Sequence, residues 1–262
     1  MTPPGAPGPL DGFLALAEKL ADAAAPIVME SFRRGAVAET KADMSPVTAA
    51  DREAEAAMRA LIEAAYPDHG ILGEELGTQN SGAEFVWVLD PIDGTQSYVT
   101  GKPLFGTLIA LARDGAPVLG VMDNPALGER WVGCEGRPTT FNGEEVSVRP
   151  CGELDQAWLY ATSPHMFEGD FDAFERLRKR VRRALYGAEC IAYGLLANGH
   201  VDLVCEATMK PYDYAALVPV VTGAGGVISD WQGEALTLGS DGRVLAAGDG
   251  RAHAKALAVL NG

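Results

Sequence analysis

The residues best suited to do chemistry are two aspartates that follow a strongly apolar segment. Residues 85–89 are all apolar and predict a buried strand, which we expect to stop at Asp90 because the proline that follows has no backbone N–H. Asp93 comes shortly afterwards, and the next residues, a glycine and a threonine, are expected to open a helix. Ligands collect at the carboxyl ends of strands in α/β sheets, and helix N-termini bind phosphate. The segment therefore predicts two carboxylates at a phosphate-binding edge.

Two other acidic positions repeat this arrangement. Glu74 and Glu75 follow the apolar segment 71–73, and Asp213 lies at the start of a predicted helix. Each motif alone is common in turns, on solvated surfaces or at helix caps. If the carboxylates converge on one cavity, however, their mutual repulsion is unfavourable unless cations lie among them. Oxygen ligands alone favour Mg²⁺, Mn²⁺ or Ca²⁺ over zinc, so the combination predicts a site for divalent cations.

The overall charge restricts the class of ligand. The chain of 262 residues has a formal net charge of −15, which disfavours nucleic acids and anionic membranes as partners. A phosphorylated ligand fits this charge only if bound cations reverse the local field. No apolar segment approaches the roughly 20 residues that cross a bilayer, and the N-terminus does not resemble a secretory signal. We expect a cytoplasmic protein in which the four scattered cysteines are reduced structural thiols.

The elements that must position these acids are a mixture of helices and short strands. Apolar spacing predicts amphipathic helices at 12–32 and 49–65. Short apolar segments predict a meander of strands at 70–73, 85–89, 107–112, 117–123 and 129–133. In the second half, strands at 157–161, 201–205, 227–229 and 244–247 are interspersed with helices at 170–182, 191–199, 213–222 and 252–260. Such a mixture indicates stacked layers of helices and sheets.

Taken together, the acidic motifs resemble those of the inositol monophosphatase superfamily. The resemblance covers residues 41–226 and rests on Gly73-Glu74-Glu75, on Asp90-Pro91-Ile92-Asp93-Gly94-Thr95, and on Asp213 followed by Gly-Ala-Gly-Gly. It implies an α+β fold of the layered αβαβα sandwich type. It also implies a lithium-sensitive, Mg²⁺-dependent phosphatase that is usually a homodimer and acts on a small phosphorylated metabolite.

The resemblance also implies roles for individual residues. Two or three Mg²⁺ ions, or Mn²⁺ in their place, would be held by Glu74, Asp90, the carbonyl of Ile92, Asp93 and Asp213. Gly94 and Thr95 would bind phosphate oxygens through their backbone N–H groups, with Gln96 also contacting the substrate. Asp51 would accept a hydrogen bond from the Thr95 hydroxyl, and this pair and Glu74 would take the proton of the attacking water. No covalent nucleophile is required, and inorganic phosphate is the product.

One difference from the inositol phosphatases narrows the range of expected substrates: they usually have Trp where this chain has Tyr212. Together with the segment 99–111 and the Asn-Pro at 124–125, this tyrosine makes the chain similar to the histidinol-phosphate phosphatase branch. By position, Glu189 and Glu206 would face the leaving group and suit the ammonium and imidazole of histidinol. The alternatives are an inositol-1-phosphatase, a phosphatase of broad specificity, or a binding protein without turnover. The last is disfavoured because every metal ligand is present.

The chain is expected to form one catalytic unit of two halves. Residues 1–12 would be a disordered tail, 13–150 an N-terminal half with most of the metal motifs, and 151–262 a C-terminal half with the last ligand and the leaving-group pocket. The basic residues of 176–183 predict the solvated face of a helix, with phosphate steering or a subunit contact as alternatives. Lys41 matches a basic loop residue near a third metal in the family.

Overall fold

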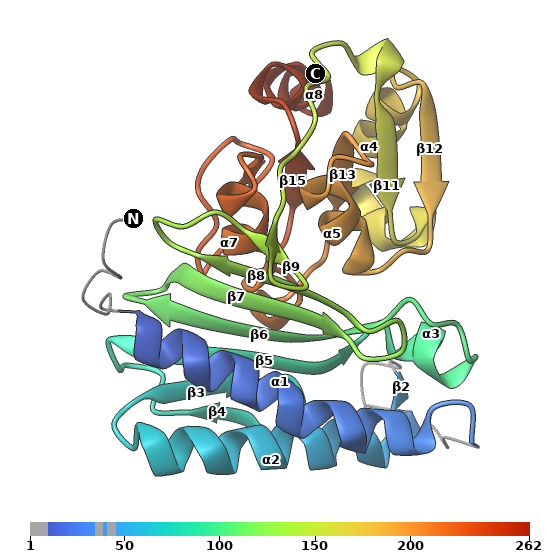
Figure 1. Cartoon of the computed structure of the whole chain (residues 1–262). Helices are drawn as coiled ribbons and strands as arrows, with labels where there is room; N and C mark the ends of the chain where they lie inside the picture. Colours follow the sequence, from blue (N-terminus) through green and yellow to red (C-terminus); the bar gives the residue numbers. More distant parts are fainter. Residues whose placement is uncertain (1–9, 35–38, 41–45) are drawn as a thin grey trace.

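The computed structural model describes residues 10–34, 39–40 and 46–262, and it consists of five layers (Figure 1). A pair of helices, α1 and α2, covers one face of an eight-stranded sheet. Helices α5, α6 and α7 lie between this sheet and a five-stranded sheet, and α4 and α8 cover the outer face of the latter. The predicted αβαβα sandwich is therefore confirmed.

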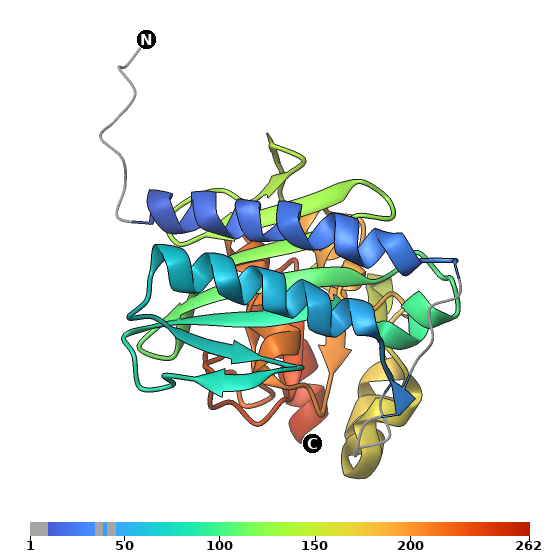
Figure 2. The same cartoon turned by 90° about the horizontal axis from the view of Figure 1, so that it is seen from below.

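The two N-terminal helices form where the apolar spacing predicts them. α1 spans Asp11–Ser31 and α2 spans Ala49–Ala65, and the two lie side by side across the sheet (Figure 2). α1 buries side chains at intervals of three and four residues, from Leu16 to Val28, against the sheet. It begins at Asp11, one residue before the predicted start, and the tail stays a prediction. Residues 1–9 and Lys41 lie outside the described residues.

The larger sheet is the predicted meander with one parallel pair. Its strand order is β10-β9-β8-β7-β6-β5-β3-β4, and only β3 and β5 are parallel neighbours. A short pair, β1 (Glu39–Thr40) and β2 (Pro46–Val47), stands apart from it. The strands of the larger sheet are β3 Gly70–Gly73, β4 Gly77–Gln79, β5 Phe85–Asp93, β6 Gly106–Arg113, β7 Ala116–Asn124, β8 Glu129–Cys134, β9 Thr140–Phe141 and β10 Glu144–Glu145.

The prediction that β5 stops at Asp90 is wrong. The strand continues through Pro91 to Asp93, with an irregular register in which one extra residue of β5 faces β6. A bulge of this kind tolerates a residue without a backbone donor. The carbonyl oxygen of Pro91 accepts a hydrogen bond from Thr107 Oγ1 at 2.8 Å. The bulge therefore lets both aspartates belong to the same strand end.

The smaller sheet has the order β12-β11-β13-β15-β14, with β11 parallel to both of its neighbours. It uses residues 158–247, whereas the larger sheet uses 70–145. The division into two halves near residue 150 stays a prediction. The elements are η1 Leu154–Gln156, β11 Trp158–Ala161, η2 Pro164–Asp170, α4 Phe171–Arg178, β12 Arg183–Tyr186, α5 Ile191–Ala197, β13 Leu203–Glu206, α6 Pro211–Tyr214, α7 Leu217–Gly223, β14 Val227–Ser229, β15 Val244–Ala247 and α8 Gly250–Asn261.

Two helix predictions in this half are wrong in extent. The helix predicted at 170–182 ends at Arg178, and Arg183 begins the unpredicted edge strand β12. The helix predicted at 213–222 is two short helices, α6 and α7, separated at residues 215–216. Pro219 does not cause this break, because it lies in the first turn of α7, where a missing N–H donor is tolerated.

None of the described helices is long and apolar enough to cross a membrane. The four cysteines form no disulfide, and Cys151 is the only one of them that is not buried.

Candidate active site

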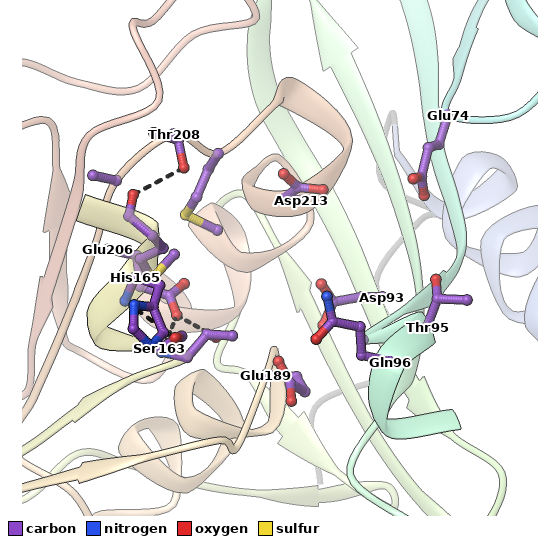
Figure 3. A pocket seen from close by; sticks show the side chains of 15 residues that line it. Glu74, Asp93, Thr95, Gln96, Ser163, His165, Glu189, Glu206, Thr208 and Asp213 are labelled. Atoms are coloured by element: carbon purple, nitrogen blue, oxygen red, sulfur yellow. Dashed lines mark hydrogen bonds between the residues drawn. The ribbon is translucent and has the colours of Figure 1, made fainter. Parts of the chain in front are cut away.

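A cavity of about 770 Å³ opens where the two sheets meet, and most of the predicted site residues line it (Figure 3). The predicted residues on its wall are Glu74, Asp93, Gly94, Thr95, Gln96, Glu189, Glu206 and Asp213. The others on the wall are Thr162, Ser163, His165, Met166, Ala207, Thr208 and Met209. Asp51, Asp90 and Ile92 lie behind this surface and are buried.

Three carboxylates that are distant in sequence converge at this cavity. Oxygen atoms of Asp90, Asp93 and Asp213 all lie within 4.8 Å of one another. The first two are held by the bulged end of β5, where Asp90 Oδ1 accepts the N–H of Ile92 at 3.0 Å. Asp213 comes from the short helix α6, and its Oδ2 accepts the N–H of Lys210 at 2.6 Å. The predicted meeting of these side chains is present.

Glu74 reaches the same place through the parallel pairing of β3 and β5. Gly73 is in register with Leu89, and the backbone N–H of Glu74 donates to the carbonyl of Leu89 at 3.1 Å. Glu74 and Asp90 are therefore the next residues on two neighbouring parallel strands. Parallel strands end at the same edge of a sheet, which explains why two such distant motifs meet.

The electrostatics of the cluster favour a bound cation. Burial, followed by the charges of Glu74, Asp93 and Asp213, raises the pKa of Asp90 well above its usual value. Burial also raises the pKa of Asp213 strongly and that of Asp93 to about 6. Within the described ranges, none of these three carboxylates forms an ion pair with a basic side chain. Divalent cations would remove this repulsion, so the donor set fits a hard metal ion.

The turn after β5 lines the cavity with Gly94 and Thr95. Gly94 has φ +81°, and a Cβ atom there would lie 2.8 Å from Cγ of Glu189. Only glycine satisfies both the left-handed conformation and this close approach. Thr95 then begins the short helix α3, Thr95–Val99. The predicted arrangement of a glycine and a helix start beside the aspartates is present.

Asp51 does not make the predicted hydrogen bond to Thr95. The Thr95 hydroxyl donates instead to the carbonyl of Ile92 at 3.1 Å. Asp51 Oδ2 accepts two hydrogen bonds from Thr48, at 2.8 Å from its N–H and 2.6 Å from its hydroxyl. Asp51 is the third residue of α2, so it forms a capping box that satisfies backbone donors at the helix start. A catalytic role for Asp51 stays a prediction.

Glu206 ends β13 and lies across the cavity from Glu74 (Figure 3). Its Oε1 accepts the N–H and the hydroxyl of Thr162 at 2.9 and 2.6 Å, and its Oε2 accepts the Tyr193 hydroxyl at 2.9 Å. Burial raises the pKa of Glu206 to about 7, although these hydrogen bonds oppose the shift. Burial therefore disfavours the ionised form of Glu206 in the absence of a positive ligand.

Glu189 is held over Gly94 in a strained conformation, with φ +51°. Its Oε1 accepts the Ser97 hydroxyl at 2.7 Å and lies 3.8 Å from Nζ of Lys102. Among the described residues both contacts use Oε1, which leaves Oε2 for a ligand. The neighbouring Cys190 N–H donates to Asp93 Oδ2 at 2.8 Å, so the Glu189 loop and the carboxylate cluster are directly connected.

Sequence reasoning missed Thr162 and Tyr193, the partners of Glu206. Thr162 follows β11, a parallel strand of the smaller sheet, and a polar residue at that position was a detectable signal. Tyr193 lies within the apolar helix α5 and gave no such signal. The basic residues near 176–183 have structural contacts. Arg176 caps the end of α8 through the carbonyls of residues 259 and 260, and the Arg182 guanidinium lies over the Trp158 ring.

The five layers and the carboxylate cluster at their central cavity define the class of protein as the metal-dependent phosphatases that the acidic motifs resemble. Comparison with known proteins agrees. The model of the inositol monophosphatase family matches residues 10–261, and the chain belongs to this family. It is therefore a phosphoric monoester hydrolase that acts on a phosphorylated substrate.

Several relatives are similar over most of their length. The bifunctional phosphatase IMPL2, chloroplastic, of Arabidopsis thaliana is 49% identical over 96% of this chain and 75% of its own. A histidinol-phosphatase of Streptomyces coelicolor is 37% identical over 95% of this chain and 96% of its own. Among solved structures, an inositol monophosphatase from Zymomonas mobilis has a TM-score of 0.90 at 47% identity, covering 97% of this chain and all of its own.

Proposed function

We propose that this chain hydrolyses histidinol phosphate to histidinol and inorganic phosphate in a Mg²⁺-dependent reaction. The observation that carries the proposal is the pair of carboxylates, Glu189 and Glu206, on the cavity wall beyond the metal cluster. A neutral polyol can offer these carboxylates only hydroxyl hydrogen bonds. An alcohol that carries an ammonium and an imidazole gains two favourable interactions.

The metal site we propose uses only oxygen ligands. Two or three Mg²⁺ ions would be held by Glu74, Asp90, the carbonyl of Ile92, Asp93 and Asp213. When bound, such cations offset the negative charge of the phosphate and lower the pKa of water. Mn²⁺ has the same ligand preference and is expected to substitute.

The surrounding groups of the chain would bind and orient the phosphate. Gly94 and Thr95 line the cavity and would bind phosphate oxygens through their N–H groups, and the Gln96 side chain lies beside Thr95. The carboxylate of Glu74 and the hydroxyl of Thr95 lie on the same wall, where Glu74 would accept the proton of the attacking water. Asp51 holds the start of α2 through Thr48, and we propose that it acts on Thr95 when substrate is bound.

The leaving group would lie between Glu189, beside the Gly94 turn, and Glu206 across the cavity (Figure 3). Oε2 of Glu189 would accept a hydrogen bond from an ammonium group. Glu206, at the end of β13, would be ionised by a bound cation, because an adjacent positive charge favours the carboxylate form. Lys102 moderates the charge of Glu189 without lining the cavity.

A second candidate is an inositol-1-phosphatase or a phosphatase of broader specificity. It is favoured by the 47% identity to the inositol monophosphatase of Zymomonas mobilis and by the bifunctional description of the Arabidopsis relative. The histidinol-phosphatase of Streptomyces supports the first candidate instead. By the family resemblance we also propose that the chain is cytoplasmic and forms a homodimer. Light scattering of the purified chain would test the dimeric state.

Phosphate release separates the two candidates. The purified chain is assayed with Mg²⁺ on histidinol phosphate and inositol 1-phosphate, and kcat/KM is compared. We expect a preference of about tenfold or more for histidinol phosphate, since a buried charge-assisted contact is worth at least about 1.4 kcal/mol. Excess chelator provides the control and should abolish both activities. A tenfold preference for inositol 1-phosphate would establish the second candidate.

A further inference from the structure

Glu55 is a fully buried carboxylate of α2 that has no role in the catalytic scheme above. Its Oε2 accepts the backbone N–H of Glu75 at 2.7 Å, and its Oε1 accepts that of Leu76 at 3.1 Å. Oε1 also accepts Nε of Arg59 at 2.7 Å, one helical turn further along α2. Nη2 of Arg59 donates in turn to the carbonyl of Gly77. The ion pair thus binds three consecutive residues of another segment.

That segment is the loop that carries Glu74. Gly73 pairs with Gly77 at the end of the β3–β4 hairpin, and the three residues between them form the turn. Gly77 has φ +75°, as three-residue hairpin loops commonly require. β3 is held by its parallel pairing with β5, but β4 is an exposed edge strand that pairs only with β3 among the described strands. The side of the turn that leads into β4 therefore gains order from contacts outside the sheet.

Gly73 makes the contact feasible. A Cβ atom at this position would lie 1.9 Å from Oε1 of Glu55 and 2.8 Å from Nη2 of Arg59. Any other residue would displace the carboxylate from the turn. The glycine before Glu74 thus makes room for the Glu55–Arg59 pair, and its φ is not in the left-handed region.

We propose that the Glu55–Arg59 pair is a positioning clamp that holds Glu74 in place for cation binding. The inference rests on the proposed function in one respect, because it takes Glu74 as a metal ligand. Groups that orient metal ligands commonly change metal affinity by 10- to 100-fold when they are removed. The pair fits this description, since it fixes the backbone on the carboxyl side of Glu74 while the carbonyl of Leu89 fixes its N–H.

The test is calorimetric titration with Mg²⁺ alone, so that its main readout does not depend on activity. Glu55→Gln keeps one acceptor oxygen but places an NH₂ group beside a backbone donor or the Arg59 guanidinium. We expect it to weaken Mg²⁺ binding about tenfold. The Mg²⁺ concentration for half-maximal activity should rise by the same factor, while kcat at saturating Mg²⁺ changes less than threefold.

A matched control is available in the smaller sheet. Asp202 is also a buried carboxylate, and it accepts two hydrogen bonds from Arg149 and one from the N–H of Trp158. It precedes β13, at the opposite end of that strand from Glu206. Asp202→Asn should lower the melting temperature yet leave the Mg²⁺ affinity within twofold of the wild type.

Three outcomes would overturn the clamp. The affinity of Glu55→Gln could stay within twofold of the wild type, or Asp202→Asn could weaken Mg²⁺ binding as much as Glu55→Gln does. If the wild type binds no Mg²⁺, the proposed metal site and the clamp are both overturned. This outcome differs from the other two, which overturn the clamp and leave the metal site in place. If Glu55→Gln does not fold, Arg59→Lys replaces it. That variant keeps the charge, loses the second donor to Gly77, and should weaken binding about threefold; an unchanged affinity contradicts the clamp.

Discussion

Replacing Glu206 by glutamine should stabilise the protein at alkaline pH and reduce its selectivity for a cationic substrate. The glutamine has nearly the same shape as the buried glutamate. Its oxygen can still accept the two hydrogen bonds from Thr162, and its NH₂ group can donate to the oxygen of Tyr193. The change therefore removes the charge while the packing around it is kept.

The size of the stabilisation follows from the pKa of Glu206. Burial raises this pKa from 4.5 to about 7, and at about 1.36 kcal/mol per unit the unfavourable contribution of the ionised form is about 3 kcal/mol. The Tyr193 hydroxyl, which donates to Oε2 in the wild type, must reorient to accept from the NH₂ group, and this offsets about 1 kcal/mol of the gain. We expect a net stabilisation of about 2 kcal/mol, or about 4–8 °C in melting temperature for a chain of this size.

The effect should depend on pH with a definite sign. Because the pKa is higher in the folded state, folding favours the protonated acid. The unfavourable contribution is absent below the unfolded pKa of 4.5, grows between pH 4.5 and about 7, and is constant above. The difference in stability between Glu206→Gln and the wild type should therefore be small at pH 5 and largest at pH 8.5.

Thermal unfolding of both proteins in chelator, from pH 5 to pH 8.5, measures this difference. Glu135→Gln removes an exposed carboxylate that pairs with Arg113 and provides a matched surface control. A Glu206→Gln variant that is less stable than the wild type at pH 8.5 would refute the reasoning, as would a difference that does not change with pH. In activity assays, kcat/KM should fall more for histidinol phosphate than for inositol 1-phosphate.

Three other substitutions or conditions give separate predictions. Asp93→Asn should reduce kcat to below about a tenth with an unchanged circular dichroism spectrum, because the amide oxygen can still accept the Cys190 N–H but a charged metal ligand is lost. Glu189→Ala should raise KM for histidinol phosphate more than for inositol 1-phosphate in steady-state assays; equal effects would remove the proposed ammonium contact. Mg²⁺ at 100 times its Kd should stabilise the fold by about 2.7 kcal/mol and raise the melting temperature by roughly 5–10 °C, reversibly on chelation; an unchanged melting temperature would contradict the metal site.

The sequence predicts the fold well wherever burial imposes a pattern. The bounds of α2, β3 and β15 agree with the predicted ranges, because their apolar residues lie on faces that must be buried. β12 was missed since it is an edge strand with three of its four residues exposed, so no alternation distinguishes it. The basic residues before it extended the apparent helix beyond Arg178. The edge strand β12 forms because it pairs with β11, and the local sequence of residues 183–186 carries no sign of that pairing.

The residues of the site fall into two similar groups, those that the sequence pattern predicts and those that it does not. The carboxylates at strand and helix ends could be predicted because the ends of neighbouring strands must share an edge. Contacts that depend on tertiary approach could not, such as the direction of the Thr95 hydroxyl or the reach of Glu55 to the Glu74 turn. The hydrogen bond between Asp51 and Thr95 was expected from the family resemblance alone; in the structure the Thr95 hydroxyl donates to Ile92, and Asp51 caps the start of α2.

The cavity contains two groups of acids whose charges must be neutralised in different ways. The cluster at the end of β5 is unfavourable without cations, and Glu206 is unfavourable without a proton or a positive ligand. A phosphate ester of a cationic alcohol complements both groups at once. Its dianionic phosphate would be attracted to a metal-filled cluster, and its ammonium to Glu189 and Glu206. An uncharged polyol phosphate complements the first group but offers Glu206 only hydroxyl donors, without a positive charge. Selectivity for a cationic alcohol would then arise from the same burial that destabilises the empty fold.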